Sequence, residues 1–593
     1  MARLTFRAGP TGSLMAVVVQ PEQQPLPSLA RRPAAAAARP TLVLFVSILC
    51  LALGLRLWGI NWGLPWAFHP DETFYADQAL EMLKYGDPDP RYFKNPSLLT
   101  YLIAGELLLA RALGPLAATF APSTPGAANL LGRLDAAAFG SASVAVVFAL
   151  GATLFNRRVG MLAGLFLAVA FLHVRDSHYG VNDVPGTALL LASLYGAARL
   201  LRDPAPRWYA LAGLAGGLAT STKYNMGFFF VPLLAAHWLA ARGRATGPRS
   251  EPEKVAAVAP WRSLRPLGLA AAASVAGYLA GTPYTMLDLP RFLQDFQTQY
   301  RFGNLAWLGQ PTDPVPLQYL TALLQGFGAI PLALALVGLA VAWRIRRPAV
   351  IVLLAFPLAY LAFLMPKALF FPRFTIPLLP ACCLLAAFGA CELVDRLRPA
   401  RRPAGLAVLL AAALAQPLAF DLLHNRILME TDTRILANQW VQAGLPPNSR
   451  LKIEDYSLRD LSKGTRTYTP NTAQLKIERF EGSPEADSAR YFAERNAQYV
   501  VTSSFTYERY LLNAPRPEQQ ESGVMYQRLH RSLEQRTELA ARFSPGVGGN
   551  EVPFRLDDLM TPFWNLEQYE RTGPTVRIYS LAPLGTAPVQ SGG

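Results

Sequence analysis

Long apolar runs alternate with short polar connections over the first two thirds of the chain. A membrane-spanning helix needs about 20 mostly apolar residues, and most of these runs approach that length. They predict eleven spans: residues 41–60, 130–155, 159–175, 184–201, 208–222, 226–241, 266–282, 318–343, 349–365, 373–393 and 404–422. The pattern therefore predicts a polytopic α-helical membrane protein, with the fifth and sixth spans shorter than usual.

A further apolar run, residues 97–113, is not counted as a span. Arginines cluster in the short loops 156–158, 202–207, 242–265, 344–347 and 396–402. Basic loops favour the cytoplasmic side of a membrane. All five loops fall on that side only if residues 97–113 lie along, or dip into, the outer leaflet. Arg31, Arg32 and Arg39 place the N-terminus inside, so the loop after the first span and the chain after the last span are predicted to lie outside.

The composition changes to that of a soluble protein after the last span. Helical patterns at residues 433–443 and 488–496 alternate with strand patterns at 450–454, 498–502 and 576–580. Such alternation is typical of a small α/β domain. We therefore expect a disordered cytoplasmic tail, rich in Ala, Pro and Arg, over 1–40, a transmembrane domain over 41–425 with an extracytoplasmic loop at 61–128, and an extracytoplasmic α/β domain over 426–593.

Composition agrees with membrane insertion. The 593 residues are 52% hydrophobic and only 16% charged, whereas soluble proteins carry about 25% charge. The net charge of +15 comes from the loop arginines and does not predict a nucleic-acid partner. The chain has no Walker loop, no G-x-G-x-x-G after a strand and no G-x-S-x-G. All cysteines lie in apolar runs and read as core residues without disulfides: Cys50, Cys382, Cys383 and Cys391.

The first outer loop has at its centre the motif His69-Pro70-Asp71-Glu72. Pro70 suits the first turn of a helix, and the two acids that follow lie at its positive end. Residues 75–84 then have an apolar and a polar face, which is typical of a helix on a membrane surface. Acids in a first turn are also ordinary capping chemistry, and the charges elsewhere on the outer face favour a functional site over this simpler interpretation.

Other charged side chains follow the spans on the same outer side. Lysine and arginine at a span end usually extend to the interface, and Arg175 taken alone is best explained in that way. Outer cations are otherwise disfavoured, so Lys223, Lys367 and Arg373 together indicate a bound anion such as a phosphate. His178 is more consistent with a hydrogen-bonding neighbour of this site than with a metal ligand, since no zinc-binding spacing is present.

Several of these motifs resemble those of the GT-C class of membrane glycosyltransferases, in the branch that includes protein O-mannosyltransferases and the bacterial lipid A aminoarabinose transferase. The resemblance covers residues 41–422. It rests on His69-Pro70-Asp71-Glu72, Lys94-Asn95-Pro96-Ser97-Leu98, Arg175 with Asp183-Val184-Pro185, Thr222-Lys223, and Lys367 with Arg373 ahead of Pro377. The family often has Lys-Pro-Pro-Leu at the second of these motifs, and this chain departs from it.

The resemblance implies an inverting glycosyltransferase of the plasma membrane that takes its sugar from a polyprenyl phosphate on the extracytoplasmic face. It implies a catalytic base at Asp71, an acceptor-site or supporting carboxylate at Glu72 and a second acid at Asp183. It further implies contacts to the donor phosphate from Lys94, Lys223, Lys367 and Arg373, with supporting roles for His69, Arg175 and His178. Some relatives use a divalent metal and others do not, so it assigns no cofactor. The acceptor is a protein, a lipid or a glycan.

Two other classes of function are compatible with a polytopic chain. A flippase for lipid-linked sugars would use a site near the bilayer midplane, in broken helices, whereas the acids here lie at the outer edge; Glu106 is within the run 97–113. A receptor-like scaffold that binds a partner through its outer domain leaves the outer charges unexplained.

Overall fold

The computed structural model describes residues 6–8, 14–16, 34–246, 264–458, 475–480, 486–514 and 516–581. The chain divides into two units, Met1–Ser47 and Ile48–Gly593. In the first, strands β1 (Phe6–Ala8) and β2 (Leu14–Ala16) pair antiparallel, and helix α1 (Ala34–Leu57) begins. Most of the predicted disordered tail, residues 1–40, lies outside the described residues.

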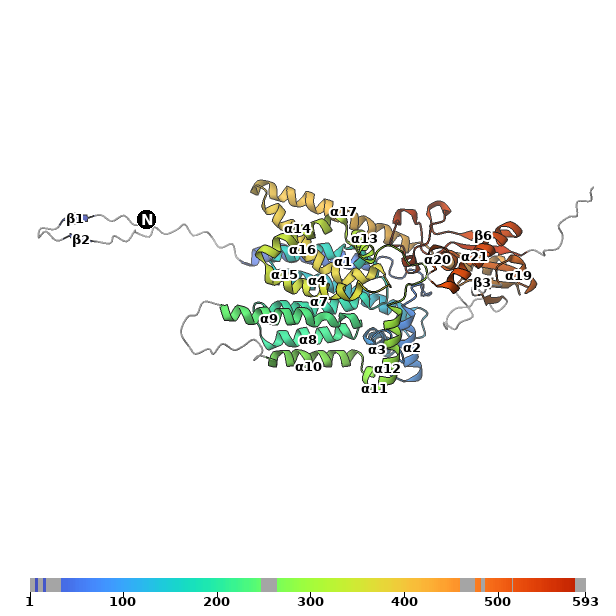
Figure 1. The fold of residues 1–593 in the computed structure, drawn as a ribbon, viewed down its shortest axis with the longest axis horizontal. Coiled ribbons are helices and arrows are strands. Elements are labelled where there is room, and N and C mark those ends of the chain that lie inside the picture. The colour runs from blue at the N-terminus through green and yellow to red at the C-terminus, as the bar shows by residue number, and fades with distance from the viewer. Residues whose placement is uncertain are drawn as a thin grey trace, which may run out of the picture. The chain divides into compact units, whose positions relative to one another are not determined.

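Long apolar helices lie alongside one another in the second unit (Figure 1). They are α4 (Ala127–Leu154), α5 (Arg157–Ala168), α7 (Asp183–Leu200), α8 (Pro206–Thr220), α9 (Phe230–Thr246), α10 (Leu264–Gly281), α14 (Ala329–Ile345), α15 (Arg347–Leu364), α16 (Leu379–Asp395) and α17 (Arg402–Met429). Small residues bring some of them very close. A Cβ atom on Gly213 of α8 would lie 2.1 Å from the Ala270 carbonyl oxygen of α10, which is the close backbone packing typical of membrane helices.

One predicted span differs from the structure. Residues 318–343 were expected to form a single helix, but α13 (Val315–Phe327) and α14 meet at an angle of 109°. Gly328 at the break has φ +105°, a conformation that favours glycine. Gln416 of α17 spans the break, since its side chain accepts from the Ala329 N–H (3.2 Å) and donates to the Leu324 carbonyl (3.0 Å).

Length and apolar composition allow six helices of the described chain to cross a membrane, or seven if the bent pair α13–α14 counts as one span. The predicted number of eleven spans therefore stays a prediction. The predicted fold class is confirmed: the chain is a mostly helical membrane protein with a C-terminal region built on a small sheet.

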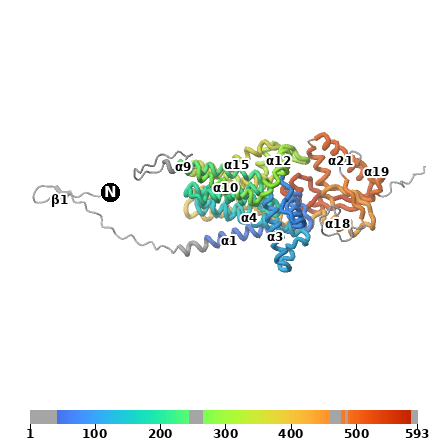
Figure 2. Tube along the Cα trace, turned by 90° about the horizontal axis from the view of Figure 1, so that it is seen from below, coloured from blue at the N-terminus to red at the C-terminus, as the bar shows by residue number. Residues whose placement is uncertain are grey.

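Shorter helices gather at the end of the helical bundle that faces the C-terminal domain (Figures 1 and 2). They are α2 (Thr73–Tyr85), α3 (Leu98–Leu113), η1 (Gly114–Phe120), α11 (Tyr284–Leu287) and α12 (Leu289–Phe302). Figure 2 shows α3 running crosswise to the long helices. Its length together with η1 would also suit a span, so its predicted place along the outer leaflet stays a prediction.

The C-terminal domain is a five-stranded sheet in the order β4-β3-β5-β7-β6, with bounds Lys476–Arg479, Arg450–Ile453, Tyr499–Ser503, Val576–Ser580 and Glu538–Phe543. β3 is parallel to β4 and β5, whereas β7 is antiparallel to β5 and β6. Its helices are α18 (Thr433–Gly444), α19 (Ala489–Glu494), α20 (Ser504–Leu512) and α21 (Pro517–Arg536).

Successive side chains of a strand point to opposite faces of the sheet, and both faces are covered by packed residues. Val500 and Tyr579 pack with Leu529 of α21, while Val501 and Ile578 pack with residues of α18 on the other face. The predicted strands at 450–454, 498–502 and 576–580 correspond to β3, β5 and β7; β4, β6, α20 and α21 were not predicted.

Candidate functional site

Asp71 lies immediately before α2, at the bundle end described above. Its Oδ2 atom is 2.6 Å from Nη1 of Arg373, and 29% of its side chain is exposed. Burial alone would raise the pKa of Asp71, but the positive charge of Arg373 outweighs it, so the pKa lies below its usual range. The structure therefore places an ionised carboxylate at the surface of a helix end, as the motif predicted.

Asp183 and Lys223 form a second ion pair near the first. The Lys223 ammonium donates to the Asp183 carboxylate, and its Nζ atom lies 5.3 Å from the ring centroid of Phe374, the neighbour of Arg373. Lys223 also lowers the pKa of Asp71. Four predicted site residues from four separate segments thus come together as two carboxylates and two cations.

The other two predicted phosphate-binding cations lie at the C-terminal end of α12. Lys94 Nζ is 5.6 Å from the ring centroid of Phe302. Lys367 Nζ is 4.1 Å from the ring centroid of Tyr300 and donates to the Asn304 side chain at 2.8 Å. The Tyr224 hydroxyl donates to the Phe93 carbonyl at 2.7 Å. Tyr224 follows Lys223 in the sequence and Phe93 precedes Lys94. The segment that carries Lys223 therefore contacts the segment that carries Lys94 directly.

Glu72 is buried, and both of its carboxylate oxygens accept hydrogen bonds. Its two carboxylate oxygens accept from Nε and Nη2 of Arg133 on α4, at 2.7 and 2.9 Å, and one also accepts from the Gly180 N–H at 2.9 Å. Arg133 donates in addition to the Ile60 and Trp62 carbonyls. Of the two roles expected for Glu72, this geometry favours the supporting one.

Arg133 was missed from the sequence, although a signal was present. It stands inside the apolar run 130–155, and a charge at such a position is costly unless it is paired. A search for its partner among the acids of the outer loop would have led to Glu72.

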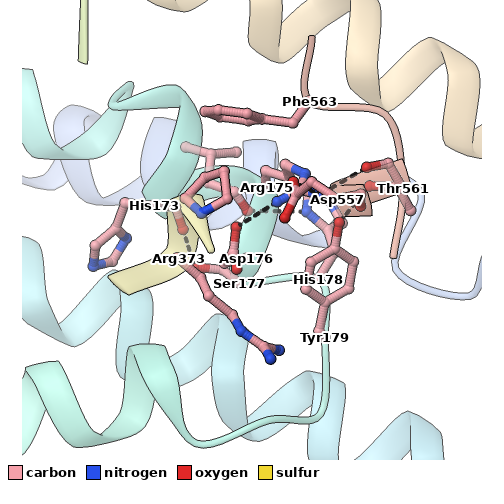
Figure 3. Close-up of polar contacts among 12 residues, drawn as sticks. His173, Arg175, Asp176, Ser177, His178, Tyr179, Arg373, Asp557, Thr561 and Phe563 are labelled. Carbon is pink, nitrogen blue, oxygen red and sulfur yellow. Dashed lines mark hydrogen bonds and ion pairs between the residues drawn. The ribbon is translucent and has the colours of Figure 1, made fainter. Parts of the chain in front are cut away.

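Arg175, taken alone, was expected to extend to the membrane interface. It is instead buried, with only 1% of the residue exposed. Figure 3 shows its guanidinium between Asp176 and the segment that carries Asp557. The Nη2 atom is 2.6 Å from Asp557 Oδ2 and donates to the Thr561 carbonyl at 2.7 Å, and Nη1 donates to Asp176 at 3.1 Å. Arg175 therefore anchors the chain after β6 to the helical bundle.

Two histidines hold backbone positions near the site. The ring nitrogens of His178 lie 3.0 and 3.1 Å from the carbonyl oxygens of Val174 and Trp58, which fits the predicted hydrogen-bonding role. His69 is buried, its Nδ1 accepts from the Asp71 N–H at 3.1 Å, and its ring centroid lies 4.6 Å from that of Tyr179. Burial lowers the pKa of His69 to about 4, so the ring is neutral at physiological pH.

A cavity of 360 Å³ opens beside His69, between the segment 67–73 and the C-terminal domain. The domain contributes residues at the carboxyl ends of β3 and β4, among them Asp455, Tyr456 and Arg479. Next to them, Glu454 is completely buried and accepts from the Ser503 N–H at 2.7 Å. Neither the cavity nor the buried Glu454 was predicted from the sequence.

Glu454 should make the stability of the protein depend on pH. Burial raises its pKa to about 8 against the opposing hydrogen bond from Ser503, whereas an unfolded Glu has a pKa of about 4.3. The folded protein thus keeps a proton that the unfolded chain releases, so stability falls as the pH rises from about 5 to about 8. The measurement is the unfolding temperature of the purified protein as a function of pH. We expect this temperature to fall less with rising pH in Glu454→Gln than in the parent protein.

Glu478→Gln is the control, because that side chain is 68% exposed on the neighbouring strand. The expectation is wrong if Glu454→Gln loses as much unfolding temperature between pH 5.5 and pH 8 as the parent protein does.

In the described part of the chain, no three His, Cys, Asp or Glu side chains come together as a possible metal site. The arrangement at the bundle end is instead one of paired acids and cations with a partly exposed carboxylate.

The family model described as dolichyl-phosphate-mannose-protein mannosyltransferase matches residues 125–259. The undecaprenyl phosphate-alpha-4-amino-4-deoxy-L-arabinose arabinosyl transferase of Pectobacterium atrosepticum is 31% identical over 169 residues, which are 27% of this chain and 28% of that relative. The match thus spans little more than a quarter of the relative's length.

Solved structures resemble a larger part of the chain. The apo form of the Archaeoglobus fulgidus oligosaccharyltransferase has a TM-score of 0.50 at 14% identity, covering 89% of this chain and 77% of that one. ArnT from Cupriavidus metallidurans in the apo state has a TM-score of 0.45 at 21% identity, covering 70% of this chain and 66% of that one. The first of these likenesses shows a shared fold.

The family match includes α4, α5, α7 and α8, and with them Arg175, Asp183 and Lys223. The resemblance inferred from the motifs is thereby confirmed: the chain is similar to the GT-C class of membrane glycosyltransferases, and its residues 125–259 match the O-mannosyltransferase model.

Proposed function

We propose that this chain is an inverting glycosyltransferase that moves a sugar from a polyprenyl-phosphate donor to an acceptor hydroxyl on the extracytoplasmic face of the membrane. The observation that carries the proposal is the position of Asp71: a partly exposed, ionised carboxylate beside the cations Arg373 and Lys223. The proposal is also supported by the relative and the family model, whose names both specify a polyprenyl-phosphate-linked sugar.

The reaction needs a base on one side of the sugar and positive charge on the other. Asp71 takes the proton from the acceptor hydroxyl while that oxygen bonds to the anomeric carbon from the face opposite the phosphate. The bond between the anomeric carbon and the phosphate oxygen breaks, and both of its electrons leave with the polyprenyl phosphate. Cations near that oxygen stabilise the transition state because negative charge accumulates there.

Arg373 and Lys223 are the cations placed best for this task. When a donor phosphate arrives, Arg373 can exchange one contact with Asp71 for contacts with the phosphate, since a guanidinium binds phosphate oxygens through two N–H groups. This exchange would free a carboxylate oxygen of Asp71 to act as base. Asp183 keeps the Lys223 ammonium in place, and Lys94 and Lys367 supply further positive charge along the path of the lipid phosphate.

The position of this site in the cell follows from the basic loops. They support a cytoplasmic N-terminus and a bundle end with Asp71 outside the plasma membrane. Polyprenyl-phosphate-linked sugars fit that location because they need no soluble nucleotide. The acceptor class is a protein, a lipid or a glycan.

The alternative function is a flippase for lipid-linked sugars. The bend between α13 and α14 gives the chain one broken helix, a feature of transporter sites. Gly328 at the bend packs against Pro331 and Pro417, however, and the paired charges lie at helix ends elsewhere. The charges therefore favour transfer over transport.

The test uses membranes that contain the full chain, with membranes that lack it as the control. Each is given a panel of polyprenyl-phosphate sugars, and the release of free polyprenyl phosphate is followed. We expect release from at least one donor only where the chain is present. Movement of a donor between the leaflets without release would instead identify a flippase and overturn the proposal.

A further inference from the structure

The cavity beside His69 lies where a ligand is expected in the C-terminal sheet. The chain passes from β3 to β4 on one side of it and then to β5 on the other, with all three strands parallel. The strand order thus reverses at β3. In open α/β sheets, ligands bind outside the carboxyl ends of the strands at such a reversal. Asp455 and Tyr456 directly follow β3, and Arg479 ends β4; all three line the cavity.

The opposite wall belongs to the loop that carries Asp71. Phe68, His69 and Thr73 line the cavity from that side. The Nδ1 atom of His69 accepts from the Asp71 N–H, so the neutral ring carries its proton on Nε2. That Nε2 atom is buried and has no hydrogen-bond partner among the described residues. A buried donor without a partner is costly, so this wall of the cavity holds an unsatisfied polar group.

The lining combines both signs of charge with flat apolar surfaces. Arg479 pairs with Asp455 at 2.9 Å. The Arg434 guanidinium lies 3.8 Å from the ring centroid of Phe68 and is held by two contacts of 2.8 Å to Asp432. Tyr456 has φ +60°, unusual for a bulky residue. Such backbone outliers cluster at functional sites.

We propose that this cavity is the acceptor subsite and that the acceptor is a glycan. The proposal rests on the transfer function proposed above. A sugar ring offers hydroxyls that both donate and accept, which match the Asp455 carboxylate as an acceptor and the Arg479 guanidinium as a donor, and its apolar face can lie on an aromatic ring such as Tyr456. A single serine or threonine side chain would occupy little of 360 Å³.

The geometry also explains how the acceptor meets the base. His69, Pro70 and Thr73 line the cavity, and Asp71 stands between Pro70 and Thr73 in the sequence, so an acceptor in the cavity lies beside the loop that carries the base. His69 is thus a positioning residue, because it lines the cavity and its Nδ1 atom accepts from the backbone N–H of Asp71.

Binding is measured with the purified full chain and a panel of defined oligosaccharides of two to four sugars, beside serine- and threonine-containing peptides of similar size. We expect the parent protein to bind at least one oligosaccharide. Arg479→Ala and Tyr456→Ala should each weaken that binding about tenfold, because a hydrogen bond to a charged group or a stacking face is lost. Arg490→Ala is the matched control, since Arg490 forms a similar ion pair on α19 and does not line the cavity.

The control Arg490→Ala should bind the oligosaccharide and release polyprenyl phosphate as the parent does, because Arg490 lies outside the cavity. Three outcomes overturn the proposal: no oligosaccharide binds, only peptides bind, or the cavity variants bind as the parent does. Failure of the parent to cleave any donor would contradict the transfer function alone, since oligosaccharide binding is measured without a donor.

Discussion

Asp71→Asn should lower the rate of sugar transfer by about 10²- to 10⁴-fold, the range that a positioned general base contributes. The amide has nearly the shape of the carboxylate and can still accept a hydrogen bond from Arg373, so the protein should fold and enter the membrane as before. It cannot take a proton from the acceptor hydroxyl. The measurement is the initial rate of product formation from a polyprenyl-phosphate sugar, normalised to the amount of protein in the membrane.

Asp77→Asn is the matched control, because Asp77 is an exposed acid of α2, the helix that Asp71 precedes. It should retain the parent rate. Transfer at the parent rate by Asp71→Asn would contradict the assignment of the base. So would a loss of activity that Asp77→Asn shares, since the cause would then be the charge of the loop.

The low pKa of Asp71 adds an expectation about pH. The Arg373 guanidinium keeps this carboxyl ionised well into the acid range, so the base should remain available as the pH falls from about 7 to about 5. A loss of activity in the parent protein over that interval must come from another group.

The sequence predicted the four residues at the centre of the site because Asp183, Lys223 and Arg373 stand at the ends of apolar runs, and Asp71 stands in the motif of the loop after the first run. Runs of about 20 residues define helix ends to within a few residues, and the basic loops define which ends share a side. Asp71, Asp183, Lys223 and Arg373 could therefore be assigned to one face, although no spacing rule connects residues that are 302 positions apart.

Contacts within the protein interior could not be predicted in this way. Arg175 meets Asp557, 382 positions later, in a stretch without strong periodicity. The bend at Gly328 was missed because a single glycine in an apolar run is common in membrane helices. The short strands β4 and β6 carry little alternation of their own, since their burial depends on strands that arrive from elsewhere in the chain.

Loss of the ion pair between Glu72 and Arg133 should have the largest effect on folding. Both side chains are at most 1% exposed, and they meet through two hydrogen bonds. Arg133→Met would leave the Glu72 charge buried with only the Gly180 N–H as a partner, which costs about 3–5 kcal/mol. That is a large part of the stability of a typical domain. We expect much less folded protein after extraction in detergent, measured by size-exclusion chromatography and thermal unfolding.

The control is Arg158→Met, which breaks an ion pair of the same length, 2.7 Å, whose side chains are 40% and 48% exposed. Such a pair contributes at most about 1 kcal/mol. The double variant of Glu72→Met and Arg133→Met removes both buried charges and should recover much of the stability that either single change loses, because the penalty comes from the unpaired charge. Additive losses in this double-mutant cycle would mean that the two side chains act independently, and Glu72 would then need another explanation for its burial beside the catalytic Asp71.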